Sequence, residues 1–131
     1  MKALLTLTEV GMLAYWVLAL IMLAGWQVVP PDAMYSDFDN PLIVAWNWSF
    51  FPIDVAFAFL GLLSRFVVRD TAMKDRLGLI GLTLMFCAGL MALTFWLIQG
   101  WFDPFWWGMN LWLVVLPILA FRRILTMRTI R

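Results

Sequence analysis

The sequence predicts an all-α integral membrane protein, a bundle of four transmembrane helices with both termini in the cytoplasm. Hydrophobic residues make up 65% of its 131 residues and charged residues 13%, whereas a soluble domain is about 45–50% apolar and about 25% charged. Four apolar segments are each long enough to cross a bilayer, which takes about 20 residues. The basic residues cluster at the segment ends that four alternating crossings would place on one side of the membrane.

The first span is predicted to run from Ala3 to Val29. This segment is too long for the apolar core of a signal peptide, and no small-residue cleavage site follows it. Pro30 and Pro31 are expected to end the helix, because proline lacks the N–H group that continues the hydrogen-bond ladder. An acidic, turn-rich loop over residues 32–40 follows on the outer side.

The second and fourth spans share a start signal, a capping side chain followed by proline at the first helical position. These signals are Asn40-Pro41 and Asp103-Pro104. A short charged loop separates spans two and three. The second, third and fourth spans are predicted over residues 41–68, 77–98 and 104–121, so residues 1–131 form a single transmembrane domain.

The orientation follows from the lysines and arginines, which are in excess in cytoplasmic loops. Arg65, Arg69, Lys74 and Arg76 lie in or beside the loop between spans two and three, and more arginines fill the C-terminal tail. The loops after spans one and three contain no basic residue. Both termini and the middle loop are therefore predicted to be cytoplasmic, at the inner membrane if the source is prokaryotic.

The composition argues against several classes of function. The net charge of +1 gives no argument for nucleic acid, and the chain has no histidine, the commonest metal ligand and a common general base. We expect no metal, no cofactor and no nucleic-acid partner, and the bilayer itself is the expected surrounding. In span three, Gly78, Gly81 and Gly89 indicate close helix packing; they also permit a homodimer.

Asp54 is the first candidate functional residue, because it falls near the middle of span two. A carboxyl group at that depth costs about 2.5–3.5 kcal/mol, so it suggests a functional site by default. Asn47 lies two turns earlier on the same helical face, and Pro52 between them is expected to kink the helix. The alternatives are a polar ligand pocket at Asp54 and an interhelical hydrogen bond from a protonated Asp54.

Two further polar residues lie inside the predicted spans. Asn110 in span four has a depth close to that of Asp54, and either lines a pocket or joins helices through its amide. Glu9 lies in the cytoplasmic third of span one. It either contributes to the site, pairs with Arg65, or extends its carboxylate toward water.

Spans two and four each carry a motif. Trp46, Ser49, Phe50 and Asp54 are matched in span two, and Asn110, Trp112 and Pro117 in span four. These motifs resemble the EXPERA superfamily, which contains the emopamil-binding sterol isomerase and the sigma-two receptor. The segment 40–54 also resembles small uncharacterised bacterial membrane proteins of the YvaD-like type.

The EXPERA resemblance implies a pocket within the bundle that takes a sterol-like or cationic amphiphilic ligand. By position, Asp54 and Asn110 would line it, with Trp112 nearby. The isomerase branch of that superfamily uses a histidine and an acid on the third helix, and this chain has neither. The resemblance therefore implies ligand binding rather than isomerisation.

We therefore predict a membrane protein that binds a hydrophobic or cationic amphiphilic small molecule, such as a sterol, lipid or amine, in an intramembrane pocket. Tryptophan and phenylalanine rings suit a cation. The alternatives are a small proton-coupled multidrug exporter, a sterol or lipid isomerase, which the missing proton carriers disfavour, and an accessory subunit. The predicted ligand-binding residues are Asp54, Asn47, Asn110, Trp46, Phe50, Trp112 and Glu9, with no catalytic residue assigned.

Overall fold

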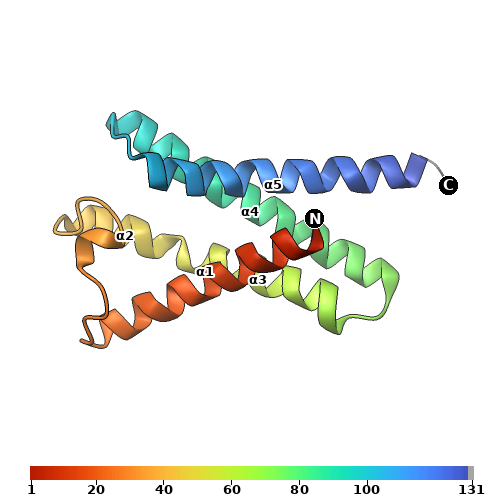
Figure 1. The fold of residues 1–131 in the computed structure, drawn as a ribbon, viewed down its shortest axis with the longest axis horizontal. Coiled ribbons are helices and arrows are strands. Elements are labelled where there is room, and N and C mark those ends of the chain that lie inside the picture. Colours follow the sequence, from red (N-terminus) through yellow and green to blue (C-terminus); the bar gives the residue numbers. More distant parts are fainter. Residues whose placement is uncertain (130–131) are drawn as a thin grey trace.

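The computed structural model describes the backbone of residues 1–129 and the side chains of residues 1–122. The described residues form helices and connecting loops, with no strand among them, and four helical segments are long and apolar enough to cross a membrane. The predicted four-helix membrane fold is thus confirmed (Figure 1). The elements are α1 (Lys2–Leu23), η1 (Pro31–Ala33), α2 (Pro41–Ser49), α3 (Phe51–Leu62), η2 (Leu63–Val67), α4 (Thr71–Gln99) and α5 (Pro104–Thr129).

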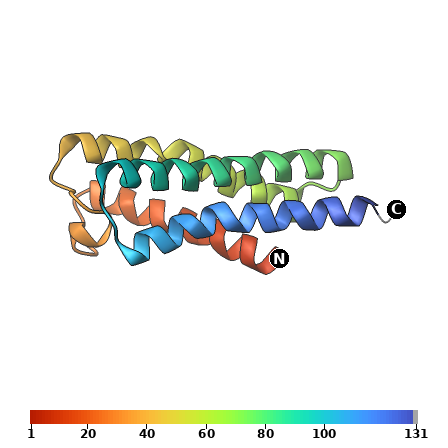
Figure 2. The same ribbon diagram turned by 90° about the horizontal axis from the view of Figure 1, so that it is seen from above.

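All four helical segments run along the long axis of the molecule (Figures 1 and 2). The α1–α2 and α4–α5 connections lie at one end. The N-terminus, the α3–α4 connection and the end of α5 lie toward the other, as four crossings require. The location of that end in the cytoplasm stays a prediction.

Helix α1 ends at Leu23 rather than at the predicted Val29. The reason is Gly25, whose positive φ of 95° belongs to the left-handed region. In this conformation the N–H groups of Gly25 and Trp26 donate to carbonyls of the last helical turn, at 3.0 and 3.3 Å, a pattern typical of glycine-terminated helices. The glycine therefore ends the helix before the two prolines do.

Helix α4 begins at Thr71 instead of the predicted Leu77. The Asp70 carboxylate caps it by accepting a hydrogen bond from the Met73 N–H at 2.7 Å. Most of the predicted charged loop is therefore the first turns of α4, and Val68, Arg69 and Asp70 make the connection.

The predicted caps of spans two and four are confirmed. Asn40 accepts from the Leu42 N–H at 3.0 Å, and Asp103 accepts from the Trp106 N–H at 2.9 Å. Span two is interrupted at Phe50, where α2 ends and α3 begins with Pro52 in its first turn. The expected proline-associated kink is thus a break between two helices.

Each helical segment places one large, almost fully buried side chain in the core. Trp16 of α1 is 2% exposed, and Phe57 of α3, Met85 of α4 and Leu116 of α5 are 0% exposed. Many other apolar side chains face outward, as suits helices whose surroundings are lipid. The buried core is therefore small and lies between the helices.

Two glycines of α4 allow close contact with its neighbours, as their spacing predicted. A Cβ atom on Gly81 would lie 3.2 Å from the Phe57 carbonyl oxygen of α3. A Cβ atom on Gly89 would lie 2.7 Å from the Asn110 carbonyl oxygen of α5. Small residues at these positions let the backbones approach each other.

A buried ion pair joins α1 to the end of span two. Glu9, which is 2% exposed, contacts the Arg65 guanidinium of η2, whose side chain is 12% exposed. Gly61 makes room for this pair, because a Cβ there would collide with the Glu9 carboxylate. Of the alternatives predicted for Glu9, the structure shows the ion pair with Arg65.

We expect Gly89→Ala to lower stability by about 1–3 kcal/mol, the range for overpacking in a closely packed interior. The added methyl group would press on backbone of α5, which cannot rotate away. Thermal unfolding of the purified protein in detergent measures the effect. Gly108→Ala is the matched control, since a Cβ there has no neighbour within 4 Å; equal behaviour of the two variants would contradict the packing assignment.

Glu9→Gln should destabilise the protein by about 3–5 kcal/mol, because it leaves the Arg65 charge buried without its counter-ion. The double variant Glu9→Gln/Arg65→Met should recover part of the loss, because both charges are then gone. A double-mutant cycle of unfolding free energies measures the coupling. Strictly additive losses would show that the pair does not stabilise the fold.

Candidate functional site

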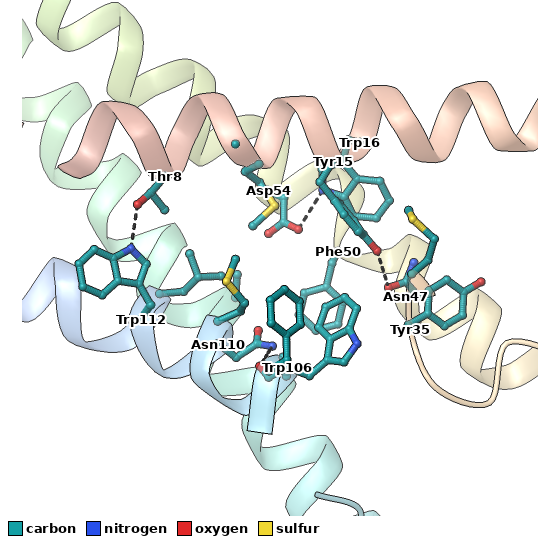
Figure 3. Close-up of a pocket in the computed structure, with 18 of the residues that line it drawn as sticks. Thr8, Tyr15, Trp16, Tyr35, Asn47, Phe50, Asp54, Trp106, Asn110 and Trp112 are labelled. Atoms are coloured by element: carbon teal, nitrogen blue, oxygen red, sulfur yellow. Dashed lines mark hydrogen bonds between the residues drawn. The ribbon is translucent and has the colours of Figure 1, made fainter. Parts of the chain in front are cut away.

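A cavity of about 720 Å³ lies inside the bundle, between α1, the α2–α3 break, α4 and α5 (Figure 3). Residues 33–36 of the α1–α2 connection also line it. Small-molecule pockets in proteins are usually about 300–1,000 Å³, mostly apolar, with a few placed polar groups. The size and the lining of this cavity match that description.

Asp54 is the one acidic residue among the described residues that line the cavity. Its side chain is 6% exposed, and its Oδ2 atom accepts a hydrogen bond from the Trp16 indole N–H at 3.0 Å. The other oxygen, Oδ1, is buried and has no hydrogen-bond donor within the described part of the chain. A buried acceptor without a donor costs free energy.

The break in span two gives Asp54 a favourable backbone setting. Because α3 starts at Phe51, Asp54 falls in the first turn of a helix rather than in the middle of one. Its own N–H donates to the Phe50 carbonyl at 2.9 Å. The partial positive charge at a helix N-terminus stabilises a carboxylate there.

Asn47 faces the same cavity from the last turn of α2 and is 9% exposed. The Tyr15 hydroxyl of α1 donates to its Oδ1 atom across 3.5 Å, at the long end of the hydrogen-bond range (Figure 3). The Tyr15 ring meets the Trp16 ring edge-on, with centroids 5.1 Å apart. Two adjacent residues of α1 thus contact both predicted polar residues of span two.

Aromatic rings form the wall between span two and α4. Trp46 stacks on Phe95 with ring centroids 4.0 Å apart, and Phe50 and Trp96 meet the Trp46 ring edge-on at 4.8 and 5.5 Å. Trp46, Phe50 and Trp96 all line the cavity. The negative faces of such rings attract cations.

Asn110 reaches the cavity from α5. Its amide N–H donates to the Trp106 carbonyl of its own helix at 2.9 Å. The alternative to a pocket role for Asn110 was a hydrogen bond between helices. The hydrogen bond that Asn110 makes lies instead within α5.

Trp112 lies at the edge of the cavity where α5 faces α1 (Figure 3). Its indole N–H donates to the Thr8 hydroxyl at 2.8 Å, a contact that joins the two helices. Thr8 in turn donates to the Leu4 carbonyl at 2.9 Å. Trp112 thus links two walls of the cavity.

Tyr35 of the α1–α2 connection also lines the cavity. Partial burial raises the pKa of its hydroxyl above the ordinary value of 10.0.

The structure brings together six of the seven predicted site residues. Asp54, Asn47, Asn110, Trp46, Phe50 and Trp112 line the cavity, whereas Glu9 does not and lies instead against Arg65. The sequence reasoning missed Tyr15, Trp16, Trp96 and Tyr35. Tyr15 and Trp16 carried a usable signal, since aromatic residues with polar tips are unusual in the middle of a span, away from the interface.

The chemical repertoire of this site is narrow. Its lining has one carboxyl group, two amides, four residues with hydroxyl groups (Thr8, Tyr15, Tyr35 and Ser36) and a large aromatic surface. Within the described residues, no group of three or more histidine, cysteine, aspartate or glutamate side chains could hold a metal ion. The arrangement suits a mostly apolar molecule with a polar group that meets Asp54.

Comparison with known proteins places the chain among relatives without a described activity. It is 36% identical to "Uncharacterized protein YvaD" of Bacillus subtilis (strain 168) over 119 residues, which cover 90% of this chain and 86% of the relative. No solved structure matches the chain significantly. The family model described as "Family of unknown function (DUF5360)" matches residues 1–131, and the chain belongs to that family.

Proposed function

We propose that this protein binds a hydrophobic or cationic amphiphilic small molecule in the cavity, with the polar group of the ligand at Asp54. The observation that carries the proposal is the position of Asp54, the one carboxyl group in the described lining of a mostly apolar cavity. Its Oδ1 atom has no donor among the described residues. Buried polar groups are normally hydrogen-bonded, so an acceptor without a donor is unusual for a residue that serves packing alone.

The ligand class follows from the rest of the lining. Trp46, Phe50 and Trp96 supply flat apolar faces that hold a ring system or an acyl chain, and that also attract a cation. A protonated amine would meet the Asp54 carboxylate with charge as well as a hydrogen bond. A hydroxyl group of a sterol-like molecule would meet it with a hydrogen bond alone.

The resemblance of spans two and four to the EXPERA superfamily supports the same proposal. The matched positions Asp54, Asn110 and Trp112 all lie on one cavity. We also propose that both termini are cytoplasmic, on the strength of the basic residues around the α3–α4 connection.

The alternative functions find less support. An exporter that exchanges a proton for a drug at Glu9 would need that carboxylate in the cavity, but Glu9 is held by Arg65. An isomerase needs two positioned proton carriers, and Asp54 is the one carboxyl group in the described lining. Ligand binding requires neither a Glu9 carboxylate in the cavity nor a second proton carrier.

Thermal unfolding with a panel of sterols, lipids and amphiphilic amines tests the proposal. A ligand that binds the folded state alone raises its stability, by about 2.7 kcal/mol at a concentration of 100 Kd. We expect at least one compound to stabilise the wild type, and Asp54→Asn to lose that shift because an amide lacks the charge and one acceptor.

Asp39→Asn is the matched control, since it removes an exposed carboxylate from the outer loop, away from the cavity. The control should respond to the same compound as the wild type does. A shift that survives in Asp54→Asn would place the ligand elsewhere, and the absence of any shift would favour the accessory-subunit alternative.

A further inference from the structure

A second hollow lies outside the cavity, between the first turns of α1 and η2 at the end of span two. It has a volume of about 540 Å³ and is lined by Lys2, Ala3, Thr6, Leu7, Val10, Arg65 and Phe66. We propose that this groove binds an anionic phospholipid, with the phosphate of the head group between Lys2 and Arg65 and an acyl chain along the apolar side chains.

The groove presents positive charge without an acid in its lining. Its two charged residues are Lys2, which is exposed and makes no ion pair within the described residues, and Arg65. Glu9 holds the Arg65 guanidinium from the bundle side through its Nη2 atom. The guanidinium carries five N–H donors in a planar fork, so Glu9 fixes its position without using all of them.

Arg65 also has a donor that the fold leaves unused. Its Nε atom is buried and has no hydrogen-bond partner within the described chain. A buried unsatisfied donor is costly, and arginine forks match the geometry of phosphate oxygens. Because Arg65 also lines the groove, we infer that its guanidinium meets the phosphate there while Glu9 holds it from the other side.

The remaining lining is suited to a lipid tail rather than to a soluble phosphate compound. Leu7, Val10 and Phe66 are 72%, 50% and 68% exposed. Leu7 and Val10 are three residues apart and so share one face of α1. An acyl chain can lie on these side chains while its head group meets the two cations.

The groove lies at the depth where head groups occur. Lys2 is the first residue of α1, and Arg65 and Phe66 precede Val67, the last residue of the second span. The sequence predicts this end of the bundle to be cytoplasmic. Basic pockets between transmembrane helices on that side bind anionic lipid head groups. The inference does not depend on the ligand proposed at Asp54.

Native mass spectrometry of the full-length protein in neutral detergent tests the proposal with defined lipids. We expect phosphatidylglycerol to bind more tightly than phosphatidylcholine of the same acyl chains. Lys2→Gln should weaken phosphatidylglycerol binding about fivefold, the effect of one basic residue near an anionic surface, and Lys2→Arg should restore it. Phe66→Ala should weaken binding through the loss of chain contact.

Arg65 is left intact in this experiment because Glu9 needs it. Lys74→Gln is the matched control, since it removes the same charge at the same end of the bundle but outside the groove. Equal weakening by Lys2→Gln and Lys74→Gln would reduce the effect to general surface charge and overturn the site. Equal affinity for the two lipids, or displacement of the lipid by millimolar glycerol phosphate, would also overturn it.

Discussion

A carboxyl group inside the hydrocarbon region of a membrane needs an arrangement that tolerates it, and much of this bundle is arranged around Asp54. The break at Phe50 moves Asp54 from the middle of a helix to the first turn of α3, where the backbone favours negative charge. Trp16 supplies one hydrogen bond from α1. One oxygen remains without a donor among the described residues, and Asp54 lines a cavity walled by aromatic rings, so local backbone structure, packing and the candidate function meet at this residue.

The two buried acidic residues, Glu9 and Asp54, differ in their surroundings. Glu9 forms an ion pair with Arg65, and Gly61 leaves space for the Glu9 carboxylate against α3. Asp54 has no such counter-ion among the described residues, and it lines the cavity. A buried ion pair adds little net stability, but it is costly to break, so the Glu9–Arg65 pair fixes α1 against span two. The position of α1 in turn sets where Tyr15 and Trp16 meet Asn47 and Asp54.

Sequence reasoning predicted well what depends on length and local chemistry. The span count, the caps at Asn40 and Asp103 and the interruption near Pro52 follow from hydropathy and backbone geometry. It failed where a short-range signal competed with hydropathy: Gly25 ends α1 early, and Asp70 starts α4 early. The contacts of Asp54 and Glu9 were harder to predict from the sequence, because lipid accepts apolar side chains on every face of a helix. Hydropathy therefore gives the depth of a residue but not the direction it faces.

The content of the cavity in the protein as purified from membranes shows whether Asp54 lies at a ligand site. Small molecules extracted from wild type and from Asp54→Asn, prepared in parallel in the same detergent, can be quantified by mass spectrometry. We expect an amphiphilic or hydrophobic compound in near-stoichiometric amount with the wild type and depleted in the variant. The same compounds in the same amounts in both preparations would contradict a ligand site at Asp54.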